Sequence, residues 1–168
     1  MNTNKINYKK QKKWACRLQC LLVAAILTFG LLGHAHAAPT GGEVVGGSAT
    51  ISQDAAMTAI QQNSDRAIIN WREFNIDPNE WVKFIQPGAN SIALNRVLGQ
   101  DPTTILGQLT ANGHVFIMNP NGVLFGQNAK IDVAGLLATT FDINNDDFMA
   151  NKNNFFQRED MAPSFVAN

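Results

Sequence analysis

Short apolar runs separated by turn residues dominate the chain from residue 39 onward. The runs are rich in Ile, Val, Phe, Thr and Trp, residues that favour a pleated, half-buried backbone. Gly, Pro and Asn interrupt them at intervals of about 5–15 residues. The pattern is that of an all-β protein. It predicts strands at 44–51, 67–76, 80–85, 91–98, 105–109, 114–118, 123–125 and 129–133.

Two segments favour helix instead. Residues 54–62 contain a run of Ala and Gln, which are good helix formers, although they give no clean apolar stripe. Residues 146–151 predict one helical turn.

The alternation of side chains predicts how two strands are buried. Ala67, Ile69 and Trp71 share one face, and Phe74 and Ile76 continue with the phase shifted by one, as a β-bulge would produce. Residues 114–118 are apolar almost without alternation, so we expect both faces of that strand to be covered.

Two turn motifs predict how strands are joined. Asn112 and Gly113 fit a two-residue type I′ hairpin turn. The sequence Asn-Pro-Asn-Gly at 119–122 fits a hairpin less well, because Pro lacks a donor while Asn and Gly accept left-handed backbone angles. We expect this second motif to be a corner between short strands, as in a parallel β-helix.

The first 37 residues read as a secretory signal. Six basic residues precede position 20, and a mostly apolar run follows at 21–33. That run is too short to span a bilayer, which takes about 20 residues. Small residues at Ala35 and Ala37 complete the pattern. We therefore expect cleavage after Ala37, with Ala38 as the new first residue and export through the periplasm.

Composition excludes some kinds of function for the chain beyond the signal. The whole chain has 168 residues, enough for one domain. Its formal net charge is zero, but beyond residue 37 there are 7 basic and 13 acidic residues. An acidic body argues against nucleic-acid binding. Both Cys residues lie within the signal, which leaves no thiol for a disulfide or a zinc site.

Candidate chemistry is sparse in this part of the chain. His114 is the sole His beyond the signal and lies in an apolar strand, so we expect a half-buried structural role. No G-x-S-x-G motif accompanies it. Asp142 opens a segment like a calcium loop, but Asp147 stands where that loop needs Gly and Asn153 where it needs Glu. The sequence predicts no catalytic residue, cofactor or metal site.

Four ordered motifs resemble a known family. They are AIINWREFNI at 67–76, SIALNRV at 91–97, ILGQL at 105–109 and NGHVFIMNPNGVLFG at 112–126. They resemble the filamentous-haemagglutinin-type secretion domain (haemagglutination activity domain) of two-partner secretion exoproteins, and are most similar to high-molecular-weight adhesins. The resemblance covers about residues 39–148. It implies a right-handed, single-stranded parallel β-helix of the pectin-lyase type, with an N-terminal cap and extra-helical strands.

The resemblance also implies a function and a partner. Residues 38–150 would form a secretion module that is recognised by the POTRA domains of an outer-membrane TpsB-type β-barrel transporter, and that nucleates β-helix folding outside the cell. Host cell surfaces or glycans would be contacted through a passenger that follows this module.

Particular residues carry the family pattern. Asn119, Pro120, Asn121 and Gly122 match its NPNG motif, and we expect them to hold a tight corner on which the transporter depends. A second set has either a core role or a role in transporter recognition: Asn70, Trp71, Phe74, Asn95 and Arg96.

The chain departs from the family pattern in two ways. An Asn-Pro-Asn-Leu motif is absent, and residues 95–97 occupy its place. Residues 151–168 do not resemble a finished solenoid cap, so we expect an incomplete tail and a truncated or degenerate copy.

Two other functions remain open at this stage: an adhesive module that binds cells or glycans, and a β-helical polysaccharide-degrading enzyme. Fold alone does not separate them from the secretion module. The ordered motifs favour the secretion module, and the lack of clustered acids weakens the enzyme.

Overall fold

The computed structural model describes residues 38–158 and 165–167, and these form stacked parallel strands in a β-solenoid of about four turns. The expected all-β class and parallel β-helix are therefore confirmed. The predicted signal segment, including Ala35 and Ala37, lies outside the described residues, as do positions 159–164 and 168 of the predicted tail.

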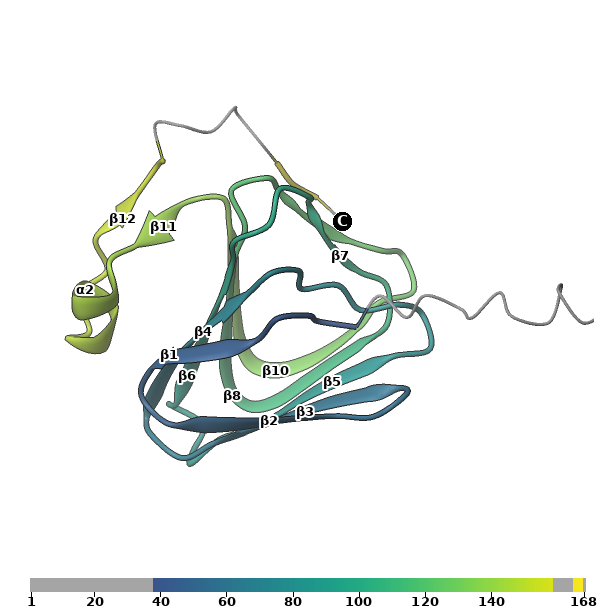
Figure 1. The fold of residues 1–168 in the computed structure, drawn as a ribbon, viewed down its shortest axis with the longest axis horizontal. Coiled ribbons are helices and arrows are strands. Elements are labelled where there is room, and N and C mark those ends of the chain that lie inside the picture. The colour runs from purple at the N-terminus through teal and green to yellow at the C-terminus, as the bar shows by residue number, and fades with distance from the viewer. Residues whose placement is uncertain (1–37, 159–164, 168) are drawn as a thin grey trace, which may run out of the picture. The chain divides into compact units, whose positions relative to one another are not determined.

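The described residues contain thirteen strands and one short helix, joined by turns and corners (Figure 1). The strands are β1 (Glu43–Gly46), β2 (Ala49–Gln53), β3 (Met57–Gln62), β4 (Arg66–Trp71), β5 (Trp81–Ile85), β6 (Ile92–Val97), β7 (Thr103–Ile105), β8 (Gln108–Met118), β9 (Val123–Phe125), β10 (Lys130–Thr139), β11 (Asp142–Ile143), β12 (Phe155–Phe156) and β13 (Val166–Ala167); the helix is α2 (Asn145–Met149).

The coils stack so that each contributes to three faces. The β4 face contains β4, β6 and the second halves of β8 and β10. The β3 face contains β3, β5 and the first halves of β8 and β10. The β7 face contains β7, β9 and β13. Figure 1 shows β3, β5, β8 and β10 running side by side, with β7 on another side of the coil.

Antiparallel strands cover the first coil. β1 pairs with β4, and β2 pairs with β3. These two strands form the N-terminal cap that the resemblance implied. The predicted single strand at 44–51 is wrong, because Gly47 turns the chain between β1 and β2 with φ of +69°. A side chain at Gly47 would collide with the carbonyl oxygen of Arg66.

The helix expected at 54–62 is wrong: this segment contains β3. The Asp54 carboxylate accepts hydrogen bonds from the backbone N–H groups of Ala56 and Met57, at 3.0 and 2.9 Å. Those bonds lower the pKa of Asp54. They imitate a helix cap but close a turn, after which Thr58 and Ile60 alternate into the interior. Packing in the sheet overrides the helix propensity of the segment.

Two further predictions about turns are wrong. Asn112 and Gly113 lie inside β8, which bends there, and neither has the positive φ that a type I′ turn needs. The phase shift after Trp71 is a corner rather than a bulge. β4 ends at Trp71, and Ile76 belongs to the next face, where it bridges in parallel to Ile105.

The remaining predicted elements hold in outline. β5, β6 and β9 occur where strands were expected, and α2 supplies the helical turn. The run at 105–109 is divided between β7 and β8, and 129–133 is the first half of a longer strand, β10.

Residues 114–118 are covered on both faces, as expected. Val115 and Ile117 belong to the main core, whereas Phe116 and Met118 pack in a second cluster with Phe148 of α2. Each coil therefore buries apolar side chains inside the solenoid, and the β4 face buries a further set outside it.

The interior supplies the first test. Phe84 on β5 is 1% exposed, and its neighbour Ile85 points outward with 39% exposed. We expect Phe84→Ala to lower the free energy of unfolding by about 3–5 kcal/mol, because it leaves a cavity between coils. The control, Ile85→Ala, should cost less than about 1 kcal/mol. Urea unfolding of residues 38–168 measures both, and equal losses would contradict the assignment of faces.

Candidate functional site

The NPNG corner joins the β4 face to the β7 face in the third coil, between β8 and β9. Asn119 has no exposed surface, Pro120 and Gly122 are buried, and Asn121 is half-buried. The motif is therefore part of the packed interior at that corner.

Asn119 connects the corner to the preceding coil. Its Nδ2 donates to the carbonyl oxygen of Asp101 and to Thr103 Oγ1, both at 3.0 Å. Its Oδ1 accepts the backbone N–H of Asn121 at 2.9 Å. One side-chain amide thus shapes its own turn and also satisfies polar groups of the second coil, which burial would otherwise leave without partners.

Asn121 makes a second connection to the same coil. Its Nδ2 donates to the carbonyl oxygen of Gly99 at 2.9 Å and to Asn119 Oδ1 at 3.2 Å. Gly99 in turn donates its backbone N–H to the carbonyl oxygen of Arg72, at 3.0 Å, in the first coil. The corners of three successive coils are therefore hydrogen-bonded one on another.

The backbone of the motif and of Val123, which follows it, bonds in the opposite direction, to the fourth coil. Asn119 donates its backbone N–H to the carbonyl oxygen of Thr139 at 3.0 Å, and Val123 donates to that of Phe165 at 2.9 Å. Gly122 has φ of +114°, and a Cβ there would lie 2.7 Å from the Phe165 oxygen. Both the backbone angle and this approach require Gly.

Four residues of the second predicted set are buried and the fifth, Asn70, is half-buried; the buried four are Trp71, Phe74, Asn95 and Arg96. Trp71 donates from Nε1 to Asn95 Oδ1 at 3.0 Å, and Asn95 Nδ2 donates to the carbonyl oxygen of Phe116 at 3.2 Å. Trp71 and Phe74 pack edge to face with ring centroids 5.5 Å apart. These contacts link the first three coils through their interior.

Arg96 lies on the opposite side of the same strand as Asn95 and bonds to the extra-helical segment that contains β11, α2 and β12. Its guanidinium donates to Asp142 Oδ1 at 2.8 Å and to the Ile143 carbonyl oxygen at 2.5 Å. It also donates to Asn145 Oδ1 at 2.8 Å and to Asn70 Oδ1 at 3.4 Å. The structure thus brings Asn70 and Arg96 together, away from Trp71 and Phe74.

Sequence reasoning missed Arg66, which serves the same segment from the first coil. Arg66 donates to the Phe148 carbonyl oxygen at 2.9 Å, and its guanidinium carbon lies 4.7 Å from the Phe148 ring centroid. Burial lowers the pKa of Arg66. These partners are 82 positions apart, so no local spacing could have indicated the contact.

His114 makes a packing contact between the third and fourth coils. The His114 ring packs so closely over Gly135 that a side chain at 135 would overlap it. Over residues 38–158 and 165–167, no group of three His, Cys, Asp or Glu side chains could hold a metal ion. No helix within those ranges is long and apolar enough to cross a membrane.

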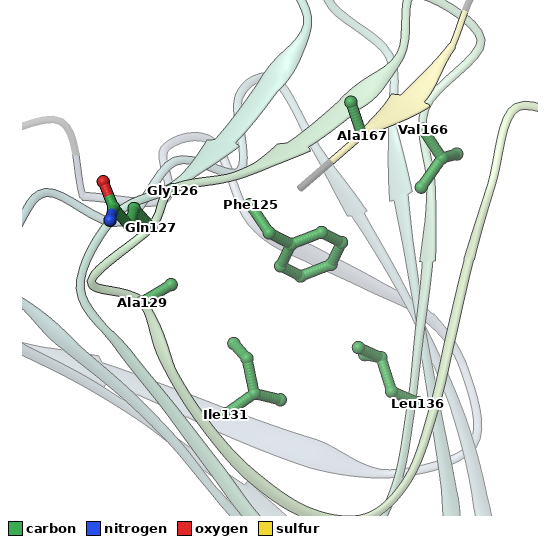
Figure 2. Close-up of a pocket in the computed structure, with 8 residues that line it drawn as sticks. All are labelled: Phe125, Gly126, Gln127, Ala129, Ile131, Leu136, Val166 and Ala167. Atoms are coloured by element: carbon green, nitrogen blue, oxygen red, sulfur yellow. The ribbon is translucent and has the colours of Figure 1, made fainter.

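An apolar hollow of about 560 Å³ lies at the fourth coil (Figure 2). Phe125, Ile131 and Leu136 project toward it from β9 and β10, and Val166 borders it from β13. A smaller hollow of about 300 Å³ lies beside Leu137, Phe141 and Phe155. Both hollows adjoin β10, whose sole strand partner among the described residues is β8.

Comparison with known proteins places this arrangement among two-partner secretion proteins. Two Haemophilus influenzae proteins, each named heme/hemopexin-binding protein, are 43% identical over 123 residues and 42% identical over 127 residues. Each match covers 73% of this chain but 14% of the relative, so the chain spans about one seventh of their length.

A solved structure gives the same result. The crystal structure of the HMW1 secretion domain from Haemophilus influenzae matches with a TM-score of 0.73 and 42% identity, covering 77% of this chain and 35% of that one. The TPS secretion domain family, which is not a family of enzymes, matches residues 35–164. With its stacked coils and buried NPNG corner, the chain belongs to the TPS secretion domain family.

Proposed function

We propose that this chain is a secretion module recognised in the periplasm by the POTRA domains of a TpsB-type outer-membrane transporter, and that it nucleates solenoid folding outside the cell. Membership of the TPS family implies a TpsB transporter as partner in general. The recognition by POTRA domains and the nucleating role are the parts that we propose.

The proposed nucleating role is supported by a difference in strand pairing between the first and the fourth coil. β1 and β2 cover the first coil with antiparallel pairing. At the fourth coil, β10 has one partner among the described residues, and apolar side chains line the hollow beside it. An unpaired strand edge above an apolar interior is a template for adding another strand. The module would therefore block growth at one end and promote it at the other.

The NPNG corner would act on secretion through the fold. Since Asn119 has no exposed surface, a transporter has no access to its side chain in the folded module. Its hydrogen bonds instead join the second and third coils at the point where the fourth coil leaves the solenoid. We propose that the motif is needed to complete the nucleus, and that its loss slows folding at the cell surface.

The residues directly after the proposed cleavage site are part of the fold. Pro39 is buried and accepts a hydrogen bond from Gln53 Nε2 at 2.6 Å, and Thr40 bonds to Glu73 at 2.8 Å. These contacts support cleavage between Ala37 and Ala38, with residues 38 onward forming the exported module.

A second candidate concerns the longer protein. The two relatives named heme/hemopexin-binding protein favour a parent exoprotein that binds heme or hemopexin. The resemblance of the four motifs to high-molecular-weight adhesins favours a parent adhesin instead. The adhesive role would belong to a passenger. Binding of the isolated module to heme, hemopexin or a glycan array would show instead that the module itself binds these ligands.

Export is the first experiment. The full chain is expressed with and without its TpsB-type transporter, and culture medium and periplasm are assayed separately. We expect the chain in the medium only when the transporter is present. Its mass should be that of a chain that begins at Ala38. Periplasmic accumulation regardless of the transporter would contradict the proposed function, and a different mass would contradict the cleavage site alone.

The corner supplies the second experiment. Asn119→Ala combined with Asn121→Ala removes the donors to Asp101 and Gly99, and one unsatisfied buried carbonyl costs about 1–3 kcal/mol. We expect a lower urea midpoint and less chain in the medium, with normal signal cleavage. Asn90→Ala, at an exposed position between β5 and β6, is the matched control. Normal secretion of the double variant would refute the role of the corner.

A further inference from the structure

Residues 142–156, which we name the clasp, leave the solenoid after the fourth coil has formed two of its sides, and return to the outer surface of the β4 face. They contain β11, α2 and β12, which Figure 1 shows beside β4 and β6. β11 and β12 pair with each other rather than with a coil. The clasp therefore holds to the solenoid through side chains.

A nearly buried ion pair anchors the clasp to the second coil. The side chains of Arg96 and Asp142 are 11% and 14% exposed, and their atoms lie 2.8 Å apart. The further bonds of Arg96 to Ile143 and Asn145 use the rest of the guanidinium. A charge at this depth is stable only while its partners stay in place, so Arg96 depends on the clasp being docked.

A second arginine anchors the clasp to the first coil. Arg66 donates to the Phe148 carbonyl oxygen at the end of α2 and to Asn151 Oδ1, and it lies over the Phe148 ring. A cation over an aromatic face adds to the attraction when water is excluded. Arg66 and Arg96 thus belong to different coils but bind the same short segment.

Phe148 fills an outward-facing apolar row that crosses three coils. It is 1% exposed and belongs to one buried cluster with Ile68 of the first coil, Leu94 of the second and Met118 of the third. The Phe116 ring, also of the third coil, meets it at 6.2 Å between centroids. A single side chain therefore touches coils that are not neighbours.

The contacts of the clasp join residues that lie farther apart in the sequence than the hydrogen-bonded residues of neighbouring coils. In a solenoid each coil touches only the next, so the coils can open one after another. The interior Trp71–Asn95 bond spans 24 positions, whereas the Arg66–Phe148 and Arg66–Asn151 bonds span 82 and 85. Contacts of that separation close a long loop, and the entropy cost of closing it is smaller once the intervening coils are in place.

We infer that the clasp couples the first three coils into one cooperative folding unit, with Arg66 and Arg96 as its positioning residues. The unit is complete only when the chain has folded as far as Asn151. Without the clasp, the coils of the stack would instead open separately, one after another. The inference concerns folding alone and holds whether or not a transporter recognises the module.

Hydrogen exchange on residues 38–168 tests the coupling, with Arg66→Ala and Arg96→Ala as variants. We expect amides of β4 and β6 to lose protection about tenfold or more relative to those of the first half of β8, because the first coils then open separately. In the parent chain these strands should exchange with one common free energy.

The controls separate coupling from local anchoring. Arg72→Ala removes an exposed arginine of the first coil. Lys152→Ala removes a charge of the clasp that pairs with Asp147, also in the clasp, at 3.9 Å. Both variants should match the parent chain. Phe148→Leu should retain most of the coupling and Phe148→Ala should lose it. If Arg96→Ala does not fold, Arg66→Ala and the Phe148 pair decide. Loss confined to residues 142–156, or an equal loss in every strand, would overturn the inference.

Discussion

The fold depends on hydrogen-bond partners for the backbone groups at the corners of the solenoid. Within each face, parallel strands satisfy one another's backbone, but at a corner the carbonyl oxygens turn away from that ladder. Side-chain amides take over there. Asn112, between the β3 and β4 faces, donates to the backbone oxygen of Gln86 and accepts from its N–H, both at 2.7 Å. The asparagines of the NPNG motif serve the corner between the β4 and β7 faces. Stacking of one coil on the next is therefore set by residues that a strand pattern leaves out.

Local pattern was enough to find most strands, because period and composition report burial. It was not enough to tell where one strand ends and a corner begins. Asn112 and Gly113 look alike in a hairpin and in a bent parallel strand, and only the ladders to β5 and β6 distinguish the two. The segment before β3 failed for a similar reason, since Asp54 makes the same two backbone contacts in a turn as at a helix start.

The candidate site shows the same division. The NPNG corner was identified from the chain itself because its residues are consecutive. The split of the second set could not be seen in the sequence: neighbouring residues on a strand point to opposite sides, so Asn95 faces the core while Arg96 faces the clasp. Arg66 had no signal at all, because its partners follow three coils later.

Burial of the motif also bears on how secretion could depend on it. A partner that binds a folded surface would need exposed residues, and Asn119 offers none. If secretion depends on Asn119, the dependence therefore arises from folding. Loss of its hydrogen bonds would slow the folding of the exported chain, and with it transport. The unequal ends agree with this proposal, because the first coil is capped by β1 and β2, whereas β10 has one strand partner among the described residues. In that scheme the corner and the clasp complete the same nucleus, the first by joining neighbouring coils and the second by joining distant ones.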